Sequence, residues 1–248
     1  MRNNFIDMLK TIAVISMIFI HSFMWINNQI YYPVLSELPY YIGRLSSPLF
    51  FFCSGVTIIF THNSSRQMII ESILLFLIGM FLNFSIGFLL FNVISLFGGV
   101  LQIIAINKII IYIINKKKIQ RKGLIITVII YLIYGISPLN INLEFFANIY
   151  WILFPLGYIY AKYYNYNIKR KFYLGRISLT VFVSHIFIIL YPIYLLNLYL
   201  GCNMLISYFV AVIYILIFYF LSIFITKSSR NFSIEHLLYL IKKKKIFN

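Results

Sequence analysis

The sequence has little charge, and what it has is mostly basic. Only 10% of its 248 residues are charged, with 5 Asp and Glu against 21 Lys and Arg, whereas 62% are hydrophobic. A water-soluble fold has to cover its surface with polar side chains. The composition therefore excludes a soluble enzyme, a disulfide scaffold and a disordered tail.

Cysteine and histidine are scarce as well. The two cysteines, Cys53 in an apolar run and Cys202 in a short loop, lie too far apart along any membrane path to form a disulfide framework. Two of the four histidines, His62 and His236, fall in predicted cytoplasmic segments, so zinc would lack its three or four ligands. The sequence also has no Gly-rich phosphate loop, Ser nucleophile elbow or paired-carboxylate motif. We expect no metal site, and any chemistry to be a direct transfer assisted by a base.

Apolar runs dominate the sequence instead, and they have the length of membrane-spanning helices. We predict an all-α, polytopic transmembrane helix bundle of about eight spans. The first run is retained rather than cleaved as a signal peptide, because charged residues adjoin it and no small-residue cleavage site follows. The predicted spans cover residues 5–26, 40–61, 68–88, 97–115, 123–136, 146–161, 173–196 and 204–226.

Basic residues occur in alternate connections between these spans. The segments after spans two, four and six and the C-terminal tail carry Lys and Arg, whereas the opposite connections hold only Glu37 and Glu144. The positive-inside rule then places both termini in the cytoplasm. We expect a multi-pass protein of the cell (plasma) membrane. We divide it into a transmembrane domain, 1–230, and a basic tail, 231–248, which either lies along the inner leaflet or is solvated. The positive charge thus reports topology, and no nucleic-acid partner is expected.

Three prolines fall within the predicted spans. At Pro48, Pro155 and Pro192 a helix is expected to kink, because proline frees a carbonyl that must then face protein or water. A packed bundle with an interior cavity would meet this need.

A polar stripe runs along the first predicted span. Asp7, Lys10, Met17 and His21 recur at helical spacing, and Lys10 and His21 point within about 20° of one direction. At about 1.5 Å per residue these two side chains differ in depth by about 16 Å. Lys10 is therefore expected near the cytoplasmic surface and His21 in the outer third of the membrane.

Ionisable residues inside a membrane are costly and mark function. His21 is the strongest candidate for a general base, because a neutral imidazole takes up a proton near physiological pH. Arg44, at the outer start of the second span, would attract an anion at the depth of His21 or would simply snorkel to the outer headgroups.

Three further polar residues lie in predicted spans. Glu71 is expected to form a structural ion pair, with Lys10 or Arg66 as its partner. Gln102 and His185 face the interior of the bundle if polar side chains avoid lipid, although a glutamine there also serves to bridge helices.

The first span resembles that of integral-membrane acyltransferases. Its pattern runs from Arg2 through Asp7 and Lys10 to His21, with ten residues between the basic residue and the histidine, as in the acyltransferase-3 family. Lys10 and Thr11 stand where that family has Arg and Gly.

Other stretches extend the resemblance over most of the chain. Residues 43–55, GRLSSPLFFFCSG, and 99–102, GVLQ, resemble segments of heparan-alpha-glucosaminide N-acetyltransferase catalytic domains, although Ile103 stands where an Arg usually follows. Residues 175–185 are similar to a late helix of the acyltransferase-3 family. Residues 9–45 also look like pilin-acetylating membrane proteins of conjugative plasmids.

The resemblance implies acyl transfer, from cytoplasmic acetyl-CoA or another acyl-CoA to an amine or hydroxyl of a glycan or lipid-linked acceptor on the outer side. Lys10, Asp7 and Gln102 would then bind the acyl-CoA, whose phosphates the basic inner loops attract. His21 would act as general base, and Arg44 would orient the substrate or stabilise the oxyanion. The expected partners are the lipid bilayer, acyl-CoA and the acceptor. No metal is required, and an oligomer is compatible with the pattern.

Two other classes are compatible with a polar stripe. One is a small multi-span transporter or flippase with the stripe along its first helix, and the other is a non-catalytic subunit whose stripe holds helices together. A transporter would need no acyl-CoA and would be expected to show repeat symmetry between its halves, which the sequence lacks. We therefore favour the acyltransferase.

Overall fold

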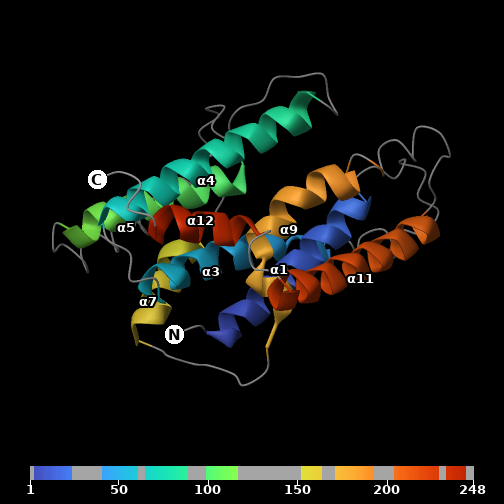
Figure 1. Cartoon of the computed structure of the whole chain (residues 1–248), viewed down its shortest axis with the longest axis horizontal. Coiled ribbons are helices and arrows are strands. Elements are labelled where there is room, and N and C mark those ends of the chain that lie inside the picture. The colour runs from blue at the N-terminus through green and yellow to red at the C-terminus, as the bar shows by residue number, and fades with distance from the viewer. Residues whose placement is uncertain are drawn as a thin grey trace. The chain divides into compact units, whose positions relative to one another are not determined.

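The computed structural model is all-helical in the parts of the chain that it describes, where no strand occurs (Figure 1). The described residues are 3–23, 41–60, 65–88, 99–116, 152–163, 171–190, 192, 204–228 and 233–243. The helices in chain order are α1 (Asn4–Phe23), α3 (Ser46–Phe60), α4 (Ser65–Ile86), α5 (Val100–Lys116), α7 (Leu153–Tyr163), α8 (Tyr173–Arg176), α9 (Ser178–His185), the π-helical η3 (Ile186–Leu190), α11 (Met204–Ser228) and α12 (Ile234–Lys243).

Several of these helices have the length and composition of membrane spans. Among the described residues, four are long and apolar enough to cross a bilayer: Asn4–Phe23, Tyr41–Phe60, Gln67–Ile86 and Ile206–Lys227. Each coincides with a predicted span, which confirms an all-helical membrane protein. The fifth predicted span, 123–136, lies outside the described residues. The count of eight and the cytoplasmic placement of the termini stay predictions.

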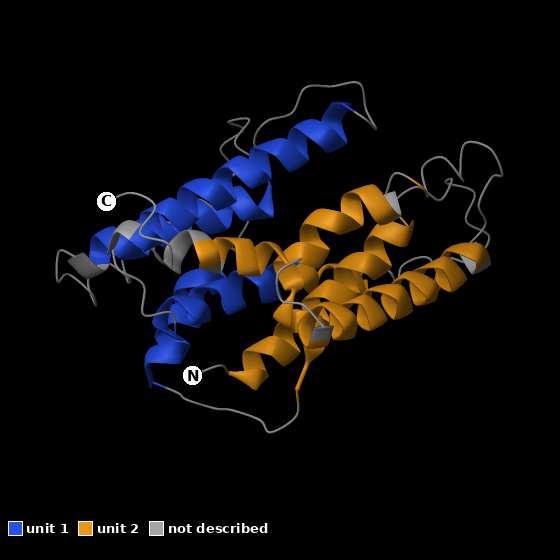
Figure 2. Cartoon of the chain, in the orientation of Figure 1, with its two compact units in different colours: residues 1–2, 47–166 blue, residues 3–46, 167–248 orange. Residues whose placement is uncertain are grey.

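The chain divides into two compact units (Figure 2). Unit 1 comprises residues 1–2 and 47–166, with α4, α5, α7 and nearly all of α3. Unit 2 comprises residues 3–46 and 167–248, with α1, α8, α9, η3, α11 and α12. In this division α12 belongs to the same unit as α1. The division into a transmembrane domain, 1–230, and a basic tail, 231–248, stays a prediction.

Unit 1 contains two antiparallel helix pairs. In the first, the backbones of α3 and α7 approach closely at two glycines. A Cβ on Gly55 would lie 1.9 Å from the Phe154 carbonyl oxygen, and a Cβ on Gly157 would lie 2.1 Å from that of Phe52. Small residues permit this close packing, which is how membrane helices associate without a hydrophobic driving force.

In the second pair, α4 and α5, polar side chains join the helices. The amide oxygen of the fully buried Gln102 accepts hydrogen bonds from Asn83 Nδ2 (3.2 Å) and from the Gly99 N–H (3.1 Å). Glu71 forms an ion pair, as predicted, and Lys108 is a partner that the sequence did not predict, with 2.6 Å between Nζ and Oε1. Both charges are largely buried, so each neutralises the other where water cannot.

The prolines behave in two different ways. Pro48 has no N–H for the carbonyl of Arg44, and a turn at residues 44–45 separates the short helical stretch 41–43 from α3, as predicted. The kink predicted at Pro155 is wrong. α7 begins at Leu153, so this proline lies in the first turn, where its missing N–H has no intrahelical acceptor. The residues on both sides of Pro192 lie outside the described ranges.

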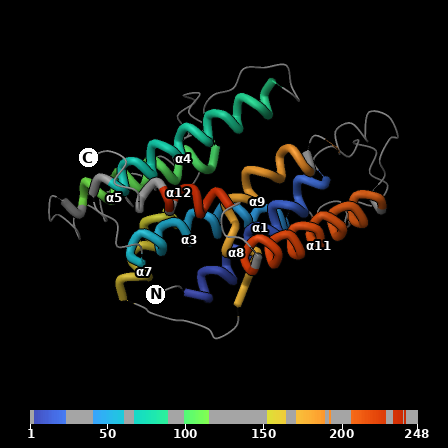
Figure 3. Tube along the Cα trace, in the orientation of Figure 1, coloured from blue at the N-terminus to red at the C-terminus, as the bar shows by residue number. Residues whose placement is uncertain are grey.

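In unit 2, α1 packs against α8, α9 and α11 (Figure 3). Asp7 contacts Arg176, whereas His21, farther along α1, contacts His185. The segment from α8 to α9 therefore runs in the same direction as α1. If both cross the membrane, an odd number of crossings must separate them, and the prediction of five intervening spans meets this condition.

α11 runs in the opposite direction. Near its beginning, the Tyr208 ring contacts Phe19 and Phe23 of α1, with ring centroids 5.6 and 4.6 Å apart. Near its end, Lys227 Nζ lies 6.0 Å from the centroid of the Tyr173 ring at the start of α8. The start of α1, the start of α8 and the end of α11 are thus at one end of unit 2. The predicted topology places all three at the cytoplasmic surface.

Candidate functional site

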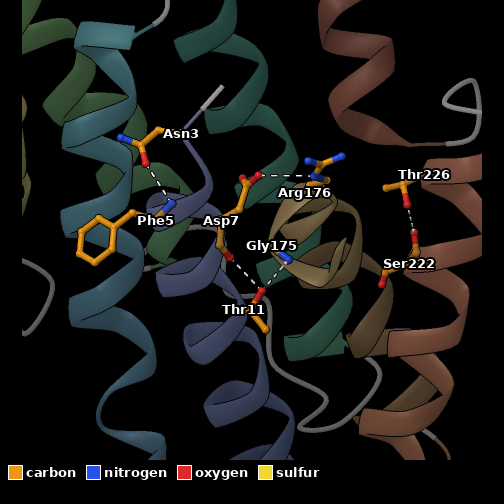
Figure 4. Close-up of polar contacts among 8 residues, drawn as sticks. All are labelled: Asn3, Phe5, Asp7, Thr11, Gly175, Arg176, Ser222 and Thr226. Atoms are coloured by element: carbon orange, nitrogen blue, oxygen red, sulfur yellow. Dashed lines mark hydrogen bonds and ion pairs between the residues drawn. The ribbon is translucent and has the colours of Figure 1, made fainter. Parts of the chain in front are cut away.

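At this end of unit 2, α1 begins with a capped turn and a buried carboxylate (Figure 4). The Asn3 side chain caps the helix, because its Oδ1 accepts the N–H of Phe5 at 2.9 Å. Asp7 is 5% exposed, and its Oδ2 lies 3.6 Å from Arg176 Nε. The Arg176 guanidinium also lies 5.6 Å from the centroid of the Tyr173 ring. The carboxylate thus holds a cation at this end of the unit.

Thr11 joins the two helices just beyond this ion pair. The Gly175 N–H donates to Thr11 Oγ1 at 2.9 Å, and the Thr11 hydroxyl donates to the carbonyl oxygen of Asp7 at 2.8 Å (Figure 4). These two hydrogen bonds give the Gly175 N–H of α8 an acceptor within the protein. Thr11 thus links α1 to α8. By contrast, the Thr226 hydroxyl, also drawn there, bonds within α11 to the carbonyl of Ser222.

Toward the other end of α1, two histidines form a stacked pair. The rings of His21 and His185 have centroids 4.8 Å apart and planes within 6° of parallel. His21 is half-buried, and His185 is 1% exposed. His185 donates through Nδ1 to the carbonyl oxygen of Phe182. At about 1.5 Å per residue, the pair lies about 21 Å along α1 from Asp7.

Each ring carries one buried nitrogen that has no hydrogen-bond partner within the described part of the chain. These atoms are His21 Nδ1 and His185 Nε2. A buried polar atom without a partner costs free energy, and native proteins tolerate few such atoms outside functional sites. Two in adjacent rings indicate a place where a ligand group completes the hydrogen bonding.

The position of His185 depends on a break in the predicted seventh span. The sequence predicts one helix over 173–196, but α8 ends at Arg176 and α9 starts at Ser178 after a turn at Ile177. A π-helical segment, η3, follows His185 directly. Such segments within α-helices are frequent at functional sites. The histidine therefore lies where the helix changes its winding.

A carboxylate from α12 completes the start of α9. Glu235 Oε1 accepts the N–H groups of Leu179 (2.7 Å) and Thr180 (3.3 Å), and Glu235 Oε2 accepts the Thr180 hydroxyl. In return, Thr180 Oγ1 accepts the N–H of Ile234 at 2.8 Å. Each helix thus satisfies donors at the beginning of the other, as a capping box does within one helix.

Replacing Glu235 by alanine is expected to lower the free energy of unfolding by about 1–2 kcal/mol. The substitution leaves the Leu179 and Thr180 amides without their acceptor. Thermal unfolding of the purified protein in detergent measures the effect. Leu237→Ala on the same helix is the control. That side chain is 53% exposed, and its loss should change stability by no more than about 0.5 kcal/mol. Equal transition temperatures for the two variants would contradict the capping role.

The other predicted site residues occupy distinct places. Lys10 is half-buried on α1, and Arg44 is exposed in the turn before α3. A Cβ on Gly43 would lie 2.4 Å from Ile20 Cβ, so the chain beside Arg44 passes α1 at the level of His21. Gln102 belongs to unit 1, where its oxygen is used by Asn83 and Gly99. Within the described ranges, no three His, Cys, Asp or Glu side chains are grouped to hold a metal ion.

Comparison with known proteins identifies the family. The family model described as heparan-alpha-glucosaminide N-acetyltransferase, catalytic, matches residues 2–168, which is more than half of the chain. The chain belongs to this family. No curated protein and no solved structure matches it. As a heparan-alpha-glucosaminide N-acetyltransferase family member, it is an acetyltransferase built on apolar helices. The resemblance to the acyltransferase-3 family stays a prediction.

The segment that the family model matches contains only one of the two stacked histidines. It contains His21, Arg44 and Gln102, but ends before α8 and α9, and so excludes Arg176 and His185. Arg176 was given no role in the sequence analysis. A basic residue inside an apolar run is costly in a membrane, however, and therefore indicates a functional role. Glu235 was missed as well, and no local signal for it exists, because its partners lie 56 and 55 residues earlier.

Proposed function

We propose that this acetyltransferase moves an acetyl group from cytoplasmic acetyl-CoA to an amine or hydroxyl of a glycan or lipid-linked acceptor on the outer side of the cell membrane, with His21 as general base. The observation that carries the proposal is the buried Nδ1 of His21, which has no hydrogen-bond partner among the described residues and lies on a helix within the acetyltransferase family segment. In the neutral tautomer that carries its hydrogen on Nε2, Nδ1 has a lone pair that can take a proton, which is what a general base requires.

The chemistry follows from the two substrates. The acceptor nitrogen or oxygen attacks the thioester carbonyl carbon, a C–N or C–O bond forms, and the C–S bond breaks to release the CoA thiolate. His21 takes the proton that the acceptor loses, and the thiolate is finally protonated to CoA. A neutral imidazole within a membrane helix suits this role, because the charge exists only while the proton is in transit.

The charged end of unit 2 supports a donor site on the cytoplasmic side. Lys10 lies one turn beyond Asp7, and Asp7 holds Arg176 beside Lys227 and Tyr173. We propose that these cations attract the CoA phosphates, with Lys10 and Asp7 as the acyl-CoA contacts. The pantetheine arm then extends along α1 toward His21.

Two of the predicted roles lie outside this donor site. For Arg44 we keep the proposed role of orienting the substrate or stabilising the oxyanion. Its neighbour Gly43 packs against Ile20, so the backbone at Arg44 lies at the level of His21 along α1. For Gln102, the contacts favour the bridging role between α4 and α5.

The test uses the wild-type protein in vesicles that hold acetyl-CoA, with glucosamine as acceptor probe on the opposite face. We expect saturable binding of acetyl-CoA to the purified protein, and one CoA released for each N-acetylglucosamine formed. Protein-free vesicles and acetate in place of acetyl-CoA are the controls. Passage of unmodified glucosamine without CoA release would establish the transporter instead, and absence of acetyl-CoA binding would overturn the proposal.

A further inference from the structure

The unassigned half of the histidine pair belongs to α9, outside the segment that the family model matches. We propose that His185 is a second substrate-contacting residue for an acceptor amine: His21 takes one of the two amine hydrogens as a proton, and Nε2 of His185 accepts a hydrogen bond from the other. The inference rests on the proposed function and adds to it a residue that orients the nucleophile.

The hydrogen bond to Phe182 determines which nitrogen of His185 is free. A carbonyl oxygen only accepts, so Nδ1 carries the hydrogen of the neutral ring, and Nε2 carries a lone pair. That lone pair is buried and has no partner within the described ranges. A ring fixed through one nitrogen and free at the other matches the arrangement in which a third group orients a catalytic histidine.

Stacking on His21 places this lone pair beside the proposed base. With ring centroids 4.8 Å apart, a group that reaches His21 is also next to His185. Two positive charges that close would repel each other strongly away from water. When His21 takes the proton, His185 therefore stays neutral, and its Nε2 remains an acceptor throughout the transfer.

The surrounding structure holds His185 in place for this task. Glu235 anchors the start of α9, the Phe182 carbonyl holds Nδ1, and the side chain is almost fully buried. The ring thus has little freedom to turn Nε2 away. This is the preorganisation that a polar contact to a reacting group needs if it is to accelerate the reaction.

Two substitutions separate this role from a structural one. In His185→Gln the side-chain amide reaches the position of Nε2, whereas in His185→Asn it reaches only that of Nδ1 and keeps a donor for the Phe182 carbonyl. We expect His185→Gln to retain kcat within about tenfold and His185→Asn to lose about 100-fold. Acetyl-CoA affinity should be unchanged in both.

A structural role predicts the reverse order, because only the Asn variant preserves the bond to Phe182. An Asn variant as active as the Gln variant, or more active, would therefore overturn the inference. Failure of the wild-type protein to turn over would instead refute the proposed function, so the two results are distinguishable.

The wild-type protein provides a second measurement that does not depend on the variants folding. With ¹⁵N-labelled histidine, the free protein should show one neutral ring protonated at Nδ1, and addition of glucosamine should shift the Nε2 resonance of that ring. Assignment uses the His21→Ala protein, which retains the His185 signals. An Nε2 resonance unchanged at saturating glucosamine, or a ring protonated at Nε2, would overturn the inference.

Discussion

The His21→Ala protein is expected to bind acetyl-CoA as the wild-type protein does, and to lose at least about 100-fold in the rate of acetyl transfer, since a general base contributes about 10²–10⁴-fold. The donor contacts proposed at Lys10 and Asp7 lie about three to four helical turns from His21, roughly 16–21 Å along α1. Removing the imidazole therefore leaves them intact. CoA release by wild type and variant at saturating acetyl-CoA, with glucosamine as acceptor, measures the loss.

A second histidine in unit 2 provides the matched control. His236 lies on α12, where its backbone N–H donates to Ser233 Oγ at 3.1 Å, and it takes no part in the stacked pair. His236→Ala should keep the wild-type rate within about twofold, as expected for a change outside the site. Full activity of His21→Ala would remove His21 from the mechanism. Loss of acetyl-CoA binding in that variant would assign it to the donor site.

Gly175→Val is expected to cost at least about 3 kcal/mol of the free energy of unfolding, at the upper end of what overpacking costs. A Cβ on Gly175 would lie 1.8 Å from the carbonyl oxygen of Asp7 and 2.6 Å from its carbonyl carbon. Both are backbone atoms, so only separation of α8 from α1 relieves the clash. That separation would also break the bond from Gly175 N–H to Thr11. Thermal unfolding in detergent and the yield of folded protein report the loss.

Gly99→Ala is the control for this substitution. A Cβ there would lie 2.9 Å from Asn83 Oδ1, the far end of a side chain that can shift at the cost of its hydrogen bond to Gln102. We expect a loss of less than about 1 kcal/mol, the usual range for a change that its neighbours can accommodate. A Gly175→Val protein as stable as the Gly99→Ala protein would show that α1 and α8 do not approach as closely as described.

A feature of this fold can be predicted from the sequence where neighbouring residues determine it. It cannot be predicted where the determining residue lies far away along the chain. Helix α11 appears as predicted because an uninterrupted apolar run needs only its own backbone to satisfy its hydrogen bonds in a membrane. The seventh span was predicted as one helix for the same reason. It breaks at Ile177 because Glu235 satisfies the amides of Leu179 and Thr180, and hydropathy cannot register an acceptor that comes from another helix.

The candidate site shows the same contrast. His21 and Asp7 could be singled out because an ionisable group within an apolar helix is costly wherever the rest of the chain lies. Their partners depend on which helices pack together. Nothing along α1 indicates that Asp7 pairs with Arg176, or that His21 stacks on His185, more than 160 residues later. The roles proposed for Lys10 and Arg44 stay predictions.

The mutual capping of α9 and α12 also bears on how the protein is made. During synthesis, Leu179 and Thr180 emerge well before Glu235, which follows 56 and 55 residues later. Until then, the first amides of α9 lack their acceptor, and the helix that carries His185 is incomplete. Contacts between helices distant in sequence cannot form before both are present. The histidine pair therefore assembles late, and a ribosome must translate past Glu235 before the enzyme can have its finished site.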